Sequence, residues 1–183
     1  MEMLSEVSSN EKSICRMNNW NEQLENAIND QINMELNASH VYLAIYSYLN
    51  QDYVGFHEAA ELAKKCSYEE KEHAEKFIKY QNIRGGTVKI NSLEEPDIDI
   101  IKKDDEKSKL LKVFEFFLKL EQSVYQNILN ISGSCNDPGL EDFLDDFIKE
   151  QLDSQYKLGV QIKQLHMIGN DGHGLYEFDK NLS

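Results

Sequence analysis

The fold is decided by the stretch Ser67-Tyr68-Glu69-Glu70-Lys71-Glu72-His73-Ala74-Glu75-Lys76. On a helix, Glu70 and His73 lie on one face, where a carboxylate and an imidazole can reach the same volume. The apolar residues around them recur at intervals of seven, and this phase predicts that both polar side chains point into a core. Because a buried carboxylate without a counter-charge is unfavourable, the pattern predicts a cation at this position.

The rest of the chain shows the same pattern, in which a row of apolar residues on one face of a predicted helix (an apolar stripe) is interrupted by a polar residue. Apolar spacing predicts four helices, over residues 19–50, 56–84, 108–132 and from the turn residues 132–139 to about 168. Each stripe contains one polar residue at a core position, and these residues are Glu35, Glu70, Glu121 and Gln151. Carboxylates with one imidazole and no thiolate favour iron or manganese over copper or a structural zinc ion. With Glu70 as a bridge between Glu35 and Glu121, two metal ions could be held close together.

The connections between the predicted helices indicate how they are arranged. The first two helices are joined by a few residues and must be antiparallel, as must the last two. Residues 87–107 form a long connection with Pro96 and a charge run, so helices two and three are predicted to be parallel. Residues 175–182 leave room for a short fifth helix. The prediction is an all-α four-helix bundle over residues 19–183, with one long crossover, a short C-terminal helix and a flexible N-terminal tail at 1–18.

Charge and composition exclude several classes of partner. The net charge of −14 argues against binding to nucleic acid or to an anionic membrane surface, and no apolar run approaches membrane-spanning length. The first residues resemble neither a secretory signal nor an arginine-rich transit sequence. The three cysteines are odd in number and widely spaced, which is typical of reduced thiols. From these features we expect a cytoplasmic protein.

Over residues 20–182 the chain resembles ferritin of the heavy, ferroxidase-bearing type. The segments that carry the resemblance are Ile32-Asn33-Met34-Glu35-Leu36, Glu69 to Lys76, Arg84-Gly85-Gly86, Asn136-Asp137-Pro138, Glu150-Gln151 and Phe178-Asp179-Lys180. The resemblance implies a shell of twenty-four subunits, all alike or mixed with other ferritin subunits. It also implies that Fe²⁺ is oxidised by dioxygen at a site for two iron ions within each subunit and stored as a ferric mineral.

The resemblance further implies roles for individual residues. The ferroxidase residues would be Glu35, Tyr42, Glu70, His73, Glu121 and Gln151. Glu69 and Glu72 would be metal-binding acids between this site and the cavity, although a solvated acidic face is the plainer interpretation. Asp142 and Asp145 would line an iron channel at the three-fold axis, whereas acids at a helix N-terminus also simply stabilise its dipole. The chain has one residue fewer than the family's usual spacing between Asp145 and Gln151.

Three other functions remain as alternatives. A different di-iron oxygenase or peroxidase on the same bundle predicts a second Glu-x-x-His motif, but Gln151 and Ser154 stand where it would be. A structural shell subunit without ferroxidase activity should lack the metal ligands. A bundle without metal would leave three acids in the core with no lysine or arginine on the stripes to neutralise them.

Overall fold

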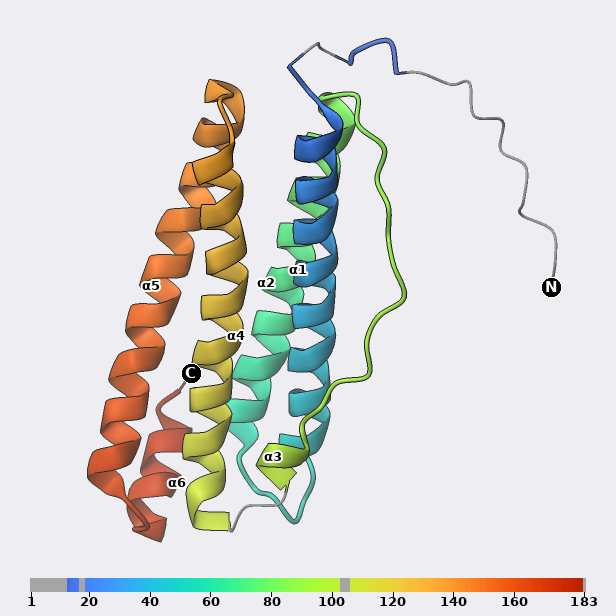
Figure 1. Cartoon of the computed structure of the whole chain (residues 1–183). Helices are drawn as coiled ribbons and strands as arrows, with labels where there is room; N and C mark the ends of the chain where they lie inside the picture. Colours follow the sequence, from blue (N-terminus) through green and yellow to red (C-terminus); the bar gives the residue numbers. More distant parts are fainter. Residues whose placement is uncertain (1–12, 17–18, 103–105, 183) are drawn as a thin grey trace, which may run out of the picture.

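A computed structural model describes residues 13–16, 19–102 and 106–182, and all regular secondary structure in these ranges is helical. The helices are α1 (Glu22–Leu49), α2 (His57–Ile83), α3 (Asp99–Lys102), α4 (Glu106–Ser134), α5 (Pro138–Ile168) and α6 (Gly172–Lys180). Figure 1 shows that α1 and α2 form one antiparallel pair, that α4 and α5 form another, and that α2 runs parallel to α4. The predicted four-helix bundle with one long crossover is confirmed.

The ends of the long helices follow from local sequence chemistry. Asn21 caps α1 by accepting a hydrogen bond from the backbone N–H of Leu24 at 2.9 Å, and Asp137 caps α5 in the same way through Leu140 at 3.0 Å. Helix α2 is followed by Gly85, whose φ of 73° lies in the left-handed region that glycine tolerates. A Cβ atom at Gly85 would also lie 2.6 Å from the backbone nitrogen of Arg16. Glycine is therefore required at this position both by its backbone conformation and by the close approach of Arg16.

The crossover is bound to α1 by a ladder of asparagine side chains. Asn29 donates to the carbonyl oxygen of Thr87 and accepts from the N–H of Lys89, both at 2.9 Å. One turn further on, Asn33 donates to the carbonyl oxygen of Lys89 at 2.8 Å and accepts from the N–H of Asn91 at 2.7 Å. These side chains satisfy the extended backbone in place of a neighbouring strand. The short helix α3, which the sequence did not predict, then leads into α4 (Figure 1).

The C-terminal helix begins earlier than predicted. Helix α6 spans Gly172–Lys180 rather than residues 175–182, because Asp171 caps it by accepting from the N–H of Gly174 at 3.1 Å. The prediction started after the glycines, which are poor helix formers, and the cap outweighs that preference. The buried Asp179 of α6 accepts a hydrogen bond from the N–H of Ala59 at 2.9 Å, so the short helix is attached to the start of α2.

The interior consists of two apolar clusters separated by a polar level. One cluster surrounds Ile45, Ala63 and Phe114, and the other surrounds Ile32 and Phe77. Burying each such large side chain stabilises the fold by about 1.5–3 kcal/mol. The polar core residues of the four stripes are all buried between the clusters, with exposed fractions of 0% for Glu35, 3% for Glu70, 4% for Glu121 and 3% for Gln151. The apolar clusters therefore hold four polar side chains at one height in the bundle.

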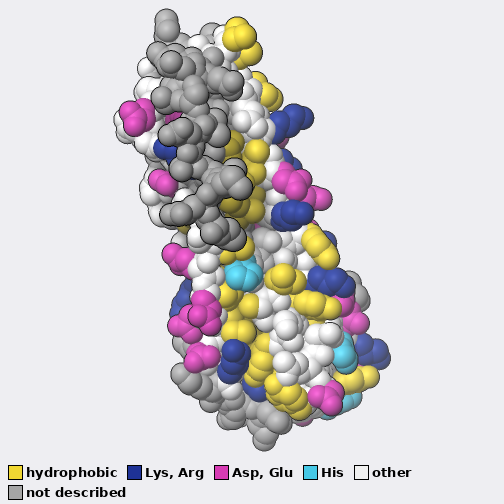
Figure 2. Space-filling view, turned by 90° about the vertical axis from the view of Figure 1, so that its right-hand side faces the viewer, with side chains coloured by type: hydrophobic (Ala, Val, Ile, Leu, Met, Phe, Trp, Pro, Cys, Tyr) yellow, Lys and Arg dark blue, Asp and Glu magenta, His cyan; other side chains and the backbone are white. Residues whose placement is uncertain are grey.

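The surface beside the crossover carries exposed apolar side chains. Figure 2 shows hydrophobic side chains gathered along the face that lies on the right of Figure 1. Ile90 and Leu93 of the crossover are exposed by 62% and 50%. Within the described ranges, none of the helices is long and apolar enough to cross a membrane. Most of the predicted tail lies outside the described residues, although Arg16 forms an ion pair with the carboxylate of Glu25.

Candidate metal centre

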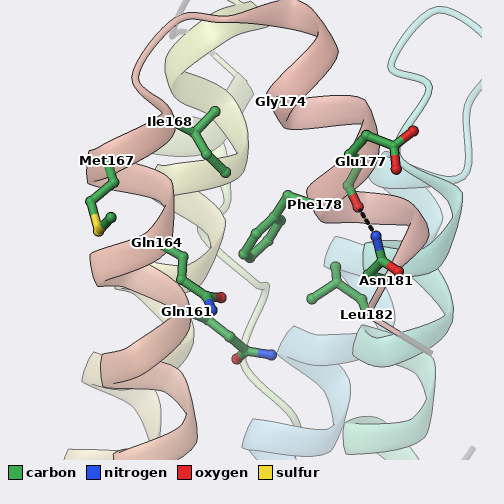
Figure 3. A pocket seen from close by; sticks show the side chains of 9 residues that line it. All are labelled: Gln161, Gln164, Met167, Ile168, Gly174, Glu177, Phe178, Asn181 and Leu182. Atoms are coloured by element: carbon green, nitrogen blue, oxygen red, sulfur yellow. Dashed lines mark hydrogen bonds between the residues drawn. The ribbon is translucent and has the colours of Figure 1, made fainter.

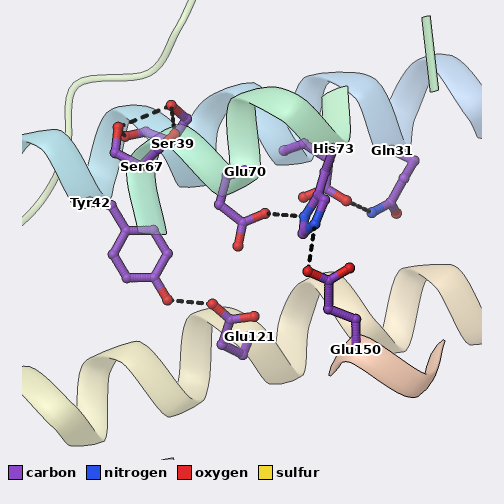
Figure 4. A network of polar contacts seen from close by, with 9 residues as sticks. Gln31, Ser39, Tyr42, Ser67, Glu70, His73, Glu121 and Glu150 are labelled. Atoms are coloured by element: carbon purple, nitrogen blue, oxygen red, sulfur yellow. Dashed lines mark hydrogen bonds and ion pairs between the residues drawn. The ribbon is translucent and has the colours of Figure 1, made fainter. Parts of the chain in front are cut away.

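Three of the predicted ligands converge in the polar level of the bundle. Glu35 of α1 and Glu70 and His73 of α2 each place one potential ligand atom so that all three atoms lie within 4.8 Å of one another. The Nδ1 atom of His73 lies 3.2 Å from a carboxylate oxygen of Glu70 (Figure 4). The spacing of three residues on α2 thus brings a nitrogen and an oxygen donor to one point, as the sequence predicted.

The second pair of helices closes the site from the opposite side. Glu121 of α4 accepts a hydrogen bond from the hydroxyl group of Tyr42 (Figure 4). Gln151 on α5 is close enough to Glu121 for its amide to oppose the rise in the pKa of that carboxyl group. Glu121 is close enough to Glu70 for the charge of Glu70 to raise its pKa. The donor set is therefore continuous from Glu35 through Glu70 to Glu121.

Burial and mutual repulsion shift the pKa values of the three carboxyl groups. Burial, followed by the nearby charge of Glu70, raises the pKa of Glu35 well above its ordinary value. The same two causes raise the pKa of Glu121 to about 7. Burial alone would also raise the pKa of Glu70, but the hydrogen bond with His73 lowers it below its ordinary value. The raised pKa values of Glu35 and Glu121 indicate an excess of buried negative charge, which a multivalent cation would neutralise.

Two buried oxygen atoms show that the residues present fit a metal ion. Gln31 donates a hydrogen bond to Oε1 of Glu35 at 2.7 Å, but Oε2 of Glu35 is buried with no hydrogen-bond partner. The side-chain oxygen of Gln151 is also buried without one. Unpaired buried acceptors are rare because each loses its hydration without compensation. A cation bound at these oxygens would supply the missing interaction.

His73 has a second carboxylate partner that the sequence reasoning missed. Its Nε2 atom lies 3.3 Å from a carboxylate oxygen of Glu150, which belongs to α5 (Figure 4). The ring edge of His73 also meets Phe147 of the same helix, with ring centroids 5.5 Å apart. Gln31 was missed as well, although its position four residues before Glu35 is a recognisable signal on a helix. The contact with Glu150 joins two helices, and no local spacing indicates it.

The acids predicted around the centre are distributed over the surface. Glu69 lines a cavity of about 390 Å³ that reaches Tyr42 and Glu121, and it pairs with Lys65 at 3.5 Å. Glu72 is exposed on α2 and does not belong to the converging group. Of these two acids, only Glu69 lines the cavity that reaches Glu121, so its position suits metal binding better than that of Glu72.

The two channel acids predicted at the start of α5 are both exposed. Asp142 lines a cavity of about 440 Å³ together with Asp146 and Glu150. Asp145 is not among the residues that line this cavity. The spacing of four residues places Asp142, Asp146 and Glu150 on one face of α5, which leads toward His73.

A larger cavity lies away from the metal centre. It has a volume of about 640 Å³ and lies between the end of α5 and α6 (Figure 3). It is lined by Gln161, Gln164, Met167, Ile168, Gly174, Glu177, Phe178, Asn181 and Leu182. Only Glu177 in this set is ionisable, so the cavity has no cluster of metal ligands.

The fold and the site together define a four-helix bundle with carboxylates and one imidazole in its core that could hold a metal ion. Residues 25–168 match the family described as Ferritin: ferritin-like domain. The chain belongs to this family, and its membership supports a role in iron storage.

Curated ferritins of plants are similar to the chain over most of its length. The chloroplastic ferritin of Malus baccata var. xiaojinensis is 38% identical over 174 residues, covering 93% of this chain and 68% of that protein. Ferritin-2, chloroplastic, of Zea mays is 38% identical over 178 residues, covering 95% and 69%. Ferritin-1, chloroplastic, of Brassica napus is 41% identical over 162 residues, covering 86% and 63%.

These names contradict the cytoplasmic location predicted from the sequence. All three relatives are called chloroplastic, and they point to a plastid instead. The prediction depended on free thiols and on the composition of the first residues. Free thiols are compatible with any reducing compartment, so they could not distinguish the cytoplasm from an organelle.

Proposed function

We propose that this protein oxidises Fe²⁺ with dioxygen at the metal centre and stores the ferric product inside a shell of twenty-four subunits. The observation that carries the proposal is the convergence of Glu35, Glu70 and His73 within 4.8 Å in the core, next to Glu121. Carboxylates with one imidazole suit iron, and the unpaired oxygens of Glu35 and Gln151 can accept a cation. By the names of its relatives, a plastid is the compartment we propose.

Two ferrous ions are the substrate, and different residues of the centre bind each of them. Glu35 and His73 bind one ion, Glu121 and Gln151 bind the other, and Glu70 bridges them. Each ferrous ion gives one electron to dioxygen. The Tyr42 hydroxyl and the Gln31 amide hold one oxygen of Glu121 and one of Glu35, so the remaining oxygens are oriented toward the ions. Gln151 is a neutral ligand, which favours release of the oxidised ion toward storage.

Surface features support the shell and the supply of iron. Two surfaces would be covered by contact between subunits. One is the face with exposed hydrophobic side chains beside the crossover, and the other is the cavity between α5 and α6. Asp142 and Asp145, at the start of α5, are the acids we propose for an iron channel between subunits, where grouped carboxylates attract Fe²⁺. We also propose that Glu69 and Glu72 bind iron on its way from the centre to the store.

The test is the oxidation of iron by the purified protein. Fe²⁺ is added without oxygen, air is admitted, and the ferric absorbance is followed while light scattering reports the particle mass. We expect a particle of about twenty-four times the 21.2 kDa chain mass and rapid ferric formation. In Glu70→Gln and His73→Ala the rate should fall by more than the ~10–100-fold that loss of an outer-shell partner causes.

Glu61→Gln serves as the matched control, because Glu61 is an exposed acid of α2 that pairs with Lys64 on the same helix. This variant should oxidise iron at the parent rate. Oxidation that is equally fast in the parent, Glu70→Gln and His73→Ala would contradict the proposed site. A full-sized particle that never oxidises iron would favour a structural shell subunit.

A further inference from the structure

Nε2 of His73 lies 3.3 Å from a carboxylate oxygen of Glu150. We propose that Glu150 is a positioning residue, which accepts a hydrogen bond from this nitrogen when the metal ion is bound and thereby directs Nδ1 of the imidazole at the ion. The proposal rests on the metal centre described above. It concerns how the single nitrogen ligand is held, because both of its ring nitrogens face carboxylates from different helices.

The two contacts of His73 are chemically distinct. Nδ1 lies 3.2 Å from Glu70, which itself belongs to the converging group of metal ligands. Nε2 lies 3.3 Å from Glu150, which does not belong to that group. A neutral imidazole carries a proton on one nitrogen and a free electron pair on the other. In the metal-free site Nδ1 also faces a carboxylate, that of Glu70. Once a cation takes the place of that contact, the carboxylate beside Nε2 stabilises the form protonated there, and the electron pair of Nδ1 is left for the cation.

The surroundings of His73 make this contact difficult to replace. The residue is only 6% exposed, so water has little access to its ring. Phe147 lies three residues before Glu150 on α5 and packs edge-on against the imidazole, with centroids 5.5 Å apart. One turn of α5 therefore supplies both an apolar wall that limits rotation of the ring and the acceptor that selects its protonated nitrogen.

Glu150 itself is better suited to this indirect role than to metal ligation. Its side chain is 53% exposed, while those of Glu70 and His73 are only 4% and 7% exposed. The exposed part of its carboxylate borders the two cavities of about 390 and 440 Å³. A half-exposed acid with one oxygen at Nε2 can orient the ring without entering the core.

The test uses Co²⁺ as the probe, titrated without oxygen into the full-length protein and followed by its visible absorption. Glu150→Ala removes the acceptor and should weaken Co²⁺ binding about 10–100-fold. Glu150→Gln retains an acceptor oxygen and should bind nearly as well as the parent. Asp153→Asn removes the same charge one turn further along α5, without a contact to His73, and calibrates the loss of one negative charge. Unfolding midpoints of the metal-free variants should match the parent.

Two results would overturn the proposal. Equal weakening in Glu150→Gln and Glu150→Ala would show that the negative charge or direct ligation matters rather than the accepted hydrogen bond. Parent-like binding in Glu150→Ala would show that His73 is held without it. Because Co²⁺ binding requires no oxidation, a parent that fails to oxidise iron would contradict the proposed function and leave this result interpretable.

Discussion

Replacing Glu35 by glutamine is expected to stabilise the metal-free protein and to abolish its stabilisation by metal. The substitution keeps the shape of the side chain, and the amide oxygen can still accept from Gln31 as Oε1 does now at 2.7 Å. The new amide N–H group can donate to Glu70. A repulsive contact between two acids is thereby exchanged for a hydrogen bond, while the binding site loses a charged ligand.

The magnitude follows from the geometry of the two acids. Their ligand atoms lie within 4.8 Å. Two unit charges at that separation repel each other by about 3.5 kcal/mol at an effective dielectric constant of about 20. Since the raised pKa of Glu35 relieves part of this repulsion by protonation, a gain of about 1–3 kcal/mol is expected, or about 3–8 °C in unfolding midpoint.

The gain should depend on pH in a defined direction. A folded-state pKa above the ordinary 4.5 of glutamate means that the folded protein loses stability as the pH rises above that value. Glutamine does not titrate. The advantage of Glu35→Gln should therefore be small near pH 4.5 and grow toward neutral pH, until the folded pKa is reached.

Thermal unfolding with a chelator, and then with added Co²⁺, measures both effects. Glu25→Gln is the matched control, because Glu25 is also buried but pairs with Arg16 and accepts from the N–H of Thr87 at 2.9 Å. This control should lower the midpoint. If Glu35→Gln lowers the midpoint as well, the carboxylates are not in conflict and the reasoning fails.

Two further predictions concern other parts of the bundle. Asp137→Asn should destabilise the protein by about 3 kcal/mol, since it breaks a buried pair with Arg84. That guanidinium lowers the pKa of Asp137, so the pair stabilises the fold above pH 3.8, and the difference from the parent in urea unfolding should vanish as the pH falls through the lowered pKa. Cys66 should be alkylated by iodoacetamide far more slowly than the exposed Cys15, because burial raises the pKa of its thiol; equal labelling in mass spectra would contradict this.

The polar level of the core could be predicted because burial on a long helix follows the phase of its apolar residues. Glu35, Glu70 and Glu121 occupy the same stripes as large apolar side chains, and all three are buried. The arrangement of the helices was also predictable, since short connections force antiparallel neighbours. Local periodicity thus determined which side chains enter the core and at what height.

Contacts between helices could not be predicted in this way. The contact of Glu150 with His73 depends on how α5 is rotated and displaced along α2, and no spacing within either helix encodes that register. The asparagine ladder has a similar origin: the sequence shows both the four-residue interval of Asn29 and Asn33 and the crossover, but it does not show that these side chains bind the crossover. The pattern within one helix indicates which of its faces is buried. Which side chains of another helix meet that face can be seen only in the packed structure.

The bundle consists of two antiparallel helix pairs, and the proposed metal centre lies at the interface between these pairs. Glu35, Glu70 and His73 belong to the first pair, and Glu121 and Gln151 belong to the second. Helices within each pair contact each other far more extensively than helices of different pairs do. Ions bound as proposed, by ligands from both pairs, would therefore cross-link the two pairs where they contact each other least. Without them, the halves should begin to part there before either pair unravels.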